Sequence, residues 1–241
     1  MYKENPKTKG SGIICCIPHN NMCPVNCHDC FFNSGRSYLE PIKKNLPNMP
    51  HRQLTKNRIV RVNDGNDSSV KREVVINTTK KYKNKFYNTS FKFGEDDFDA
   101  PVVLTLNPAQ MTDHKWHVLI TIPKNLMFVR IRVNTWNIKS VVEPAIKYYT
   151  NKKVPVVLTF MAYYTESIPR FHKHKYEFRK RTVNSYWCLK SKYWEKIIDK
   201  YKDNMLVYSC GIRYGKTISC KYCGNCLREY YSTMEKLKWA R

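Results

Sequence analysis

Three cysteines near the start of the chain, Cys23, Cys27 and Cys30, follow one another with the spacing C-x3-C-x2-C. Cysteine thiolates hold iron–sulfur clusters, and a loop of this length can reach three corners of a [4Fe-4S] cube. The fourth iron then lacks a protein ligand, so that a substrate or cosubstrate can bind to it. The spacing therefore favours a cluster that takes part in a reaction over one that only supports the structure.

Zinc is the competing interpretation of the same loop, because structural zinc sites close four ligands around the metal. Four nearby residues offer a fourth ligand: Cys15, Cys16, His19 and His28. Cys15 and Cys16 lie in an apolar run, where a free cysteine is more often a buried, inert side chain. An iron–sulfur cluster is favoured, and zinc stays open as the alternative.

A second group of cysteines near the end of the chain has the spacing C-x9-C-x2-C-x2-C, and it comprises Cys210, Cys220, Cys223 and Cys226. Four thiolates at such short intervals are typical of a closed tetrahedral metal site. The spacing does not separate a structural zinc from a second [4Fe-4S] cluster, so both are kept as alternatives. The lone Cys188 is more typical of a core position.

The composition indicates a globular protein of 241 residues, which is one large domain or one domain with a small appendage. No apolar run approaches the roughly 20 residues that span a bilayer, and the polar start of the chain does not resemble a signal peptide. A cytoplasmic location without a membrane partner is therefore expected. The cysteines are concentrated in two short stretches, which favours metal binding over disulfides.

The formal net charge of +24 suggests a nucleic-acid partner, because clustered Lys and Arg displace counterions from phosphates. The densest basic stretch, residues 170–181, is interleaved with the aromatic residues Phe171, Tyr176 and Phe178, which would suit base stacking. Elsewhere the lysines are scattered and accompany many Asn, Tyr and Ile residues, as an A/T-biased genome would encode. A nucleic-acid or nucleotide partner and a merely solvated surface both stay open.

Apolar, β-branched runs alternate with helical patterns, which predicts βα units and a parallel sheet. The expected strands are residues 12–17, 58–63, 85–90, 101–106, 116–122, 128–135, 154–160 and 205–209. The expected helices are residues 70–82, with Asp67 or Ser68 as the cap, 138–149 and 186–201. This periodicity fits an open barrel of about six units or a doubly wound sheet. The short, Pro-containing link between residues 116–122 and 128–135 predicts either a hairpin or an interruption of the pattern by a neighbouring strand.

The cysteine loop directly after a first strand, together with the strand–helix alternation, resembles the radical S-adenosylmethionine (SAM) superfamily. The family pattern places an aromatic residue just before the third cysteine, whereas this chain has Asp29 there and Phe31 and Phe32 just after it. The resemblance implies that SAM binds at the open iron of a [4Fe-4S] cluster. Reductive cleavage then yields a 5′-deoxyadenosyl radical, which abstracts a hydrogen atom from the substrate.

The same resemblance implies a set of SAM-binding residues. The family carries a glycine-rich, acidic turn after its second strand, and the matching residues here are Asp64, Gly65, Asn66 and Asp67. A predicted strand further on places three polar side chains on one side, and these are Arg130, Arg132 and Asn134. Arginine suits a two-pronged grip on the SAM carboxylate or a contact to the ribose. A plain β-turn and a charged, solvent-facing strand are the respective alternatives.

We therefore expect an α/β protein with a partial (β/α)6-type radical SAM barrel over residues 1–204 and a small cysteine-rich, metal-binding extension over residues 205–241. The resemblance implies an enzyme that modifies an unknown substrate, with a flavodoxin or ferredoxin as the reductant, and it assigns no catalytic residue. A zinc-binding, basic nucleic-acid-binding protein is the first alternative. A non-catalytic iron–sulfur protein for electron transfer or sensing is the second.

Overall fold

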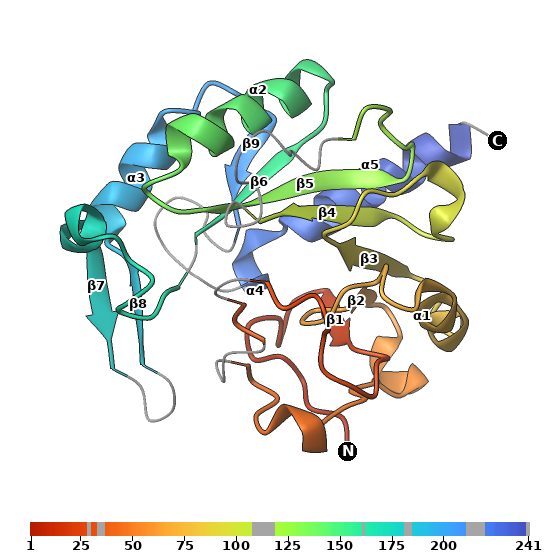
Figure 1. Cartoon of the computed structure of the whole chain (residues 1–241). Coiled ribbons are helices and arrows are strands. Elements are labelled where there is room, and N and C mark those ends of the chain that lie inside the picture. Colours follow the sequence, from red (N-terminus) through yellow and green to blue (C-terminus); the bar gives the residue numbers. More distant parts are fainter. Residues whose placement is uncertain are drawn as a thin grey trace.

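One curled sheet of seven parallel strands organises the chain (Figure 1). The computed structural model describes residues 1–27, 30–32, 37–107, 119–160, 162–180, 185–210 and 220–239. Across the sheet the strands are β1 (Ile13–Cys16), β2 (Ile59–Val62), β3 (Lys85–Thr89), β4 (Val102–Leu106), β5 (Leu126–Val133), β6 (Val156–Phe160) and β9 (Val207–Ser209). Each strand pairs in parallel with the next, so that the sheet forms a half-barrel.

The spatial order of these strands follows their order along the chain. A doubly wound sheet instead contains a point where the strand order reverses, so that alternative is wrong. The parallel α/β sheet is confirmed, and its curl is compatible with a partial barrel. β9 lies in the segment expected to form the C-terminal extension, yet it pairs with β6 in the main sheet.

Helices and short helical turns connect the strands. The α-helices of the described chain are α1 (Arg72–Thr79), α2 (Glu143–Asn151), α3 (Ser191–Asp199), α4 (Cys220–Cys223) and α5 (Asn225–Trp239). The short helical turns are η1 (Ile42–Lys44), η2 (Arg52–Thr55), η3 (Glu95–Asp97), η5 (Ile138–Val142) and η6 (Arg170–Lys175). Parallel neighbours need such crossovers, because the chain must return to the starting edge of the sheet before each new strand.

The convex face of the sheet packs against α1 and α2. Val75 of α1 and Ile146 and Tyr149 of α2 join the largest buried cluster, together with alternate side chains of β1 to β6. α3 adds Ile198, which is partly buried against the same cluster. Figure 1 shows α2 and α3 on this side of the sheet. Burial of these apolar side chains is the main driving force for the fold.

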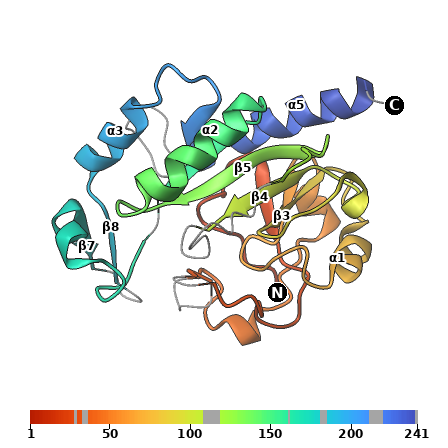
Figure 2. The same cartoon turned by 45° about the horizontal axis from the view of Figure 1, so that its top comes forward.

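The concave face carries a second apolar cluster, which α5 covers. Phe86 of β3 and Phe128 of β5 contact Leu227, Tyr230 and Met234 of α5 in this cluster. Inward and outward residues alternate along each strand, which is why one sheet supplies both clusters. α5 therefore fills the floor of the half-barrel, on the opposite side of β5 from α2 (Figure 2).

A small antiparallel hairpin lies apart from the main sheet. It consists of β7 (Tyr176–Arg179) and β8 (Tyr186–Leu189). Its inner side packs Tyr163 and Tyr176 against Trp136. Figure 1 places this hairpin on the left, beyond α3.

Of the strand predicted over residues 116–122, residues 116–118 lie outside the described residues, and the described residues 119–122 contain no strand. The Leu119 N–H donates to the Tyr149 hydroxyl (3.2 Å), and the Leu119 carbonyl accepts from the Tyr148 hydroxyl (2.9 Å). Tyrosines of α2 thus satisfy backbone groups that a neighbouring strand would otherwise bind. The predicted hairpin is also wrong, since β5 pairs in parallel with β4 and β6.

The predicted helix over residues 186–201 is half wrong. Its first residues form β8, and the helix α3 begins only at Ser191. Aromatic residues favour a pleated, half-buried surface, and Trp187 pairs across the hairpin with Phe178 at a ring-centroid distance of 5.5 Å. The pattern of bulky residues in this segment is compatible with a helix or with a strand. Pairing with β7 stabilises the strand.

The predicted cap of α1 is wrong as well. α1 begins at Arg72, and the residue before it, Lys71, has a left-handed backbone with φ 51°. The Asp67 carboxylate accepts hydrogen bonds from Thr89 (2.8 Å) and from the Ser90 N–H (2.6 Å) instead. The acidic side chain therefore ties the turn after β2 to the end of β3 rather than capping the helix.

Candidate metal and cofactor site

The parallel sheet brings the carboxyl ends of all seven strands to one edge, where α/β proteins bind their ligands. The cysteine loop leaves β1 at this edge, and the acidic turn leaves β2 beside it. The Asn63 N–H donates to the Cys16 carbonyl (2.8 Å), so the two segments begin as paired neighbours. The topology thus places the first two predicted site segments side by side.

Cys23, Cys27 and Cys30 lie together in the loop after β1, and each is half-buried. The Cys30 N–H donates to the Cys27 carbonyl (3.1 Å), which turns the loop back on itself. Burial raises the pKa of the Cys23 thiol to about 11, and the nearby Asp67, Cys27 and Cys30 raise it further. The three thiols are close neighbours in a partly desolvated loop.

The donor set suits an iron–sulfur cluster or a zinc ion, because thiolates are ligands for both. All ten cysteines are free thiols and belong to the described residues. Within those residues, no three His, Cys, Asp or Glu side chains converge on one metal position. The chemistry of the loop therefore fits a metal centre, and binding would have to draw the thiols together.

The turn after β2 packs directly against the cysteine loop. A Cβ atom added at Gly65 would overlap the ring of Phe32, which is fully buried beside the loop. The Asn66 side-chain amide donates to the Asn21 carbonyl (3.1 Å), just before the first cysteine. Gly65 and Asn66 therefore hold the loop against the sheet edge, and the glycine is needed for the close approach.

The two acidic residues of the turn are engaged within the chain. Asp64 forms a buried ion pair with Arg61 and accepts a hydrogen bond from Asn5. Both carboxylate oxygens of Asp67 are acceptors: one takes the Ser69 N–H and the Thr89 hydroxyl, and the other takes both donors of Ser90. Asp64 and Asp67 thus stabilise the turn, and their carboxylate oxygens accept hydrogen bonds from donors within the chain.

Of the polar residues predicted on β5, Arg130 lies on the concave face. It shares a pocket with Phe128 and donates to the Asn88 side-chain carbonyl (3.1 Å). Arg132 is half-buried. It lies two residues after Arg130 on β5, so that both side chains are on the same face of the strand. Asn134 accepts from the N–H groups of Trp136 (3.2 Å) and Asn137 (3.0 Å) and so closes the turn that leads to α2.

Several buried polar atoms at or near the carboxyl edge have no hydrogen-bond partner among the described residues. They are Asn63 Oδ1 after β2, Asn107 Nδ2 after β4, Asn137 Oδ1 after β5 and Thr159 Oγ1 in β6. Burying a polar atom without a hydrogen bond costs free energy. These atoms are therefore free to bind a polar ligand at this edge. These residues were not predicted as site residues, although an asparagine directly after a buried strand is a usable signal in the sequence.

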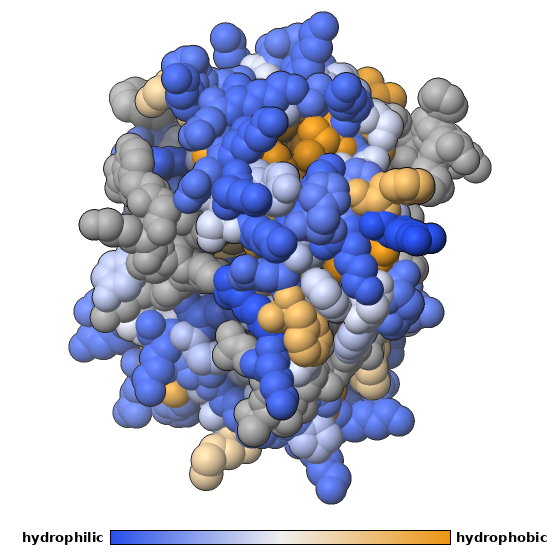
Figure 3. Space-filling view, turned by 90° about the vertical axis from the view of Figure 1, so that its left-hand side faces the viewer, coloured by the Kyte–Doolittle hydropathy of each residue, from blue (hydrophilic) through white to orange (hydrophobic). Residues whose placement is uncertain are grey.

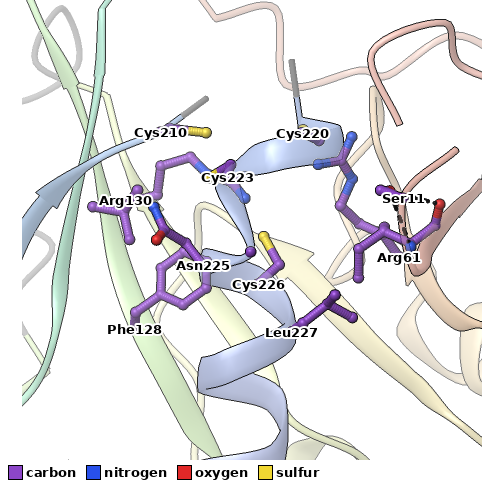
Figure 4. A pocket seen from close by; sticks show the side chains of 13 residues that line it. Ser11, Arg61, Phe128, Arg130, Cys210, Cys220, Cys223, Asn225, Cys226 and Leu227 are labelled. Atoms are coloured by element: carbon purple, nitrogen blue, oxygen red, sulfur yellow. Dashed lines mark hydrogen bonds between the residues drawn. The ribbon is translucent and has the colours of Figure 1, made fainter. Parts of the chain in front are cut away.

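The C-terminal cysteines meet in one pocket on the concave face (Figure 4). Cys210 follows β9, Cys220 and Cys223 belong to α4, and Cys226 lies in the first turn of α5. Arg61 and Arg130 line the same pocket. Burial raises the pKa of the Cys226 thiol to about 12, and the two nearby guanidinium groups act in the opposite direction. All four predicted ligands thus line one pocket, although no three of them converge on a metal position within the described residues.

The basic stretch is only partly suited to nucleic acid. Phe171 is 87% exposed and Phe178 is 53% exposed, but Tyr176 is buried in the core of the hairpin. Arg181 lies outside the described residues. The face that carries β7 and β8 is mostly hydrophilic, with small separate apolar areas (Figure 3).

Together these features define a class: an α/β half-barrel with a three-thiol loop and an incompletely satisfied polar edge at the carboxyl ends of its strands. No protein-family model matches the chain. No curated protein and no solved structure matches it either. No helix in the described part of the chain has the length and apolar character needed to cross a membrane.

Proposed function

We propose that the protein is a radical SAM enzyme whose [4Fe-4S] cluster is held by Cys23, Cys27 and Cys30. Such a cluster supplies, when reduced, the electron that cleaves SAM into methionine and a 5′-deoxyadenosyl radical. The observation that carries the proposal is the position of the three-thiol loop. It follows the first strand at the carboxyl edge of a curled parallel sheet, and the glycine turn after the second strand packs against it.

The polar residues of the edge would bind and orient SAM. Arg132 is the candidate for the carboxylate, since a guanidinium group can donate two parallel hydrogen bonds, whereas Arg130 lines the pocket of the C-terminal cysteines. Asn63, Asn107 and Thr159 offer the unpartnered buried atoms to the amino group and the ribose hydroxyls. Gly65 and Asn66 hold the cysteine loop in place rather than contacting SAM through side chains.

The floor of the half-barrel would keep water away from a reactive intermediate. α5 closes the concave face with Leu227, Tyr230 and Met234. A closed, apolar floor excludes solvent and suppresses side reactions. The substrate would then reach the site only from the carboxyl edge, and an unidentified one-electron donor such as a flavodoxin or ferredoxin would supply the electron.

Counting metals in protein purified without oxygen tests the proposal. We expect a Cys23→Ala/Cys27→Ala/Cys30→Ala variant to contain about four irons and four sulfides fewer per chain than the unmodified protein. Cys188→Ala is the matched control, because this thiol lies on β8 and should leave the iron content unchanged. Stoichiometric zinc without sulfide in the unmodified protein would contradict the proposal and favour the zinc-binding alternative.

A further inference from the structure

The four C-terminal cysteines lie where the C-terminal helices pack against the main sheet, and they come from both the sheet and the helices. Cys210 belongs to the sheet side, directly after β9, whereas Cys220, Cys223 and Cys226 belong to α4 and α5. All four line one pocket, and Figure 4 shows them around its mouth together with the two arginines. Any group bound by these thiols would connect the helices to the sheet.

Residues of α4 and α5 contact the end of β9 and the segment before β1. The Asn225 side-chain amide donates to the Ser209 carbonyl (2.8 Å) at the end of β9, and the Cys220 N–H donates to the Lys7 carbonyl (3.0 Å). A Cβ atom added at Gly12 would lie only 3.0 Å from the side chain of Leu227. The start of α5 therefore fits closely against both edges of the half-barrel, next to the four thiols.

Two arginine side chains also line the pocket. Arg61 is only 8% exposed and forms an ion pair with Asp64, while its Nε atom has no hydrogen-bond partner among the described residues. Arg130 lines the same pocket from β5. A zinc ion and an oxidised [4Fe-4S] cluster each carry a net charge of about −2 when four thiolates bind them. The half-buried Arg130 can offset part of this negative charge, whereas Arg61 is already paired with Asp64.

From these observations we propose that Cys210, Cys220, Cys223 and Cys226 bind a metal as a tetrathiolate centre inside the half-barrel, and that this metal clamps α4 and α5 onto the concave face. The proposal goes beyond the SAM chemistry and does not depend on it. Binding draws the four thiols together, so that part of the binding free energy stabilises the packed helix. Zinc and a [4Fe-4S] cluster share this ligand chemistry, and metal analysis distinguishes them.

The test uses the full chain with the N-terminal triad removed, so that any remaining metal belongs to the C-terminal site. We expect the Cys23→Ala/Cys27→Ala/Cys30→Ala variant to retain either one zinc or about four irons with sulfide per chain. Adding Cys223→Ser should abolish this metal, whereas adding Cys188→Ser should not. Either metal supports the centre. Absence of stoichiometric metal from the triad variant, or retention of metal after Cys223→Ser, overturns it.

Hydrogen exchange tests the clamp separately. In the triad variant, removal of the metal with a chelator should speed amide exchange in α5 by about tenfold or more, while α2 on the convex face stays protected. Returning the metal should restore the protection. The chelator experiment avoids any dependence on the folding of a cysteine variant. Unchanged exchange in α5 after the metal has left would overturn the clamp, and the SAM activity has no bearing on either result.

Discussion

At the scale of single residues, Gly65 connects the two segments that the sequence predicts to work together. The missing side chain lets the buried ring of Phe32 pack on the turn after β2, and Phe32 follows the third cysteine by two positions. In the radical SAM proteins that the loop resembles, the aromatic residue precedes that cysteine, whereas here Phe32 follows it and packs on Gly65. The aromatic ring anchors the loop to the sheet edge.

Gly65→Ala should destabilise the protein, because the added methyl group overlaps the Phe32 ring in a closely packed region. Overpacking of this kind costs about 1–3 kcal/mol, and the midpoint of urea unfolding measures it. Gly94→Ala is the control, since its added Cβ would only approach Asp97 to an ordinary 3.9 Å. Equal stability of the two variants would show that the loop does not depend on this contact.

Tyr149 should contribute to the loss of stability at high pH. Burial raises the pKa of its hydroxyl from 10.0 to about 12. The unfolded chain then releases the proton first, so stability is complete below pH 10 and declines as the pH rises toward 12. Tyr149→Phe should reduce this decline in urea titrations at successive pH values, with the exposed Tyr231→Phe as the control. An unchanged pH dependence in Tyr149→Phe would contradict the prediction.

At the scale of elements, the strands of the main sheet could be predicted from short apolar runs of β-branched residues, as in residues 154–160. The helix α5 was not among the expected helices, and its place could not be predicted, because an amphipathic pattern indicates a buried face but not the surface that covers it. The same limit explains residues 186–189, whose pattern suits a helix or a strand until the partner β7 is known. The unpartnered Asn107 and Thr159 were missed because satisfaction of a polar atom depends on tertiary contacts.

The packing of α5 on the concave face predicts a strong asymmetry between two neighbouring tyrosines. Tyr230 is 4% exposed and belongs to the concave cluster, whereas Tyr231 is 59% exposed. Tyr230→Ala should lower the free energy of unfolding by about 3–5 kcal/mol, as expected for the loss of a large buried aromatic ring. Tyr231→Ala should change it by less than about 1 kcal/mol. Similar values for both variants would argue against the observed position of α5.

At the scale of the whole molecule, a uniformly parallel sheet explains how distant segments share one edge. The loop after β1, the turn after β2 and the end of β5 are far apart in the sequence, and their position on one edge of the sheet follows from the direction of the strands alone. The sequence therefore predicts which segments gather, while the use of Asp64 and Asp67 within the chain is visible only in the structure.

The most direct test of the proposed function is reductive cleavage of SAM. The reconstituted protein is incubated without oxygen with SAM and dithionite, and 5′-deoxyadenosine is quantified. We expect the unmodified protein and Cys188→Ala to release it and the Cys23→Ala/Cys27→Ala/Cys30→Ala variant to release none. A protein that holds a cluster at the triad but yields no 5′-deoxyadenosine would contradict the account and favour a non-catalytic iron–sulfur protein.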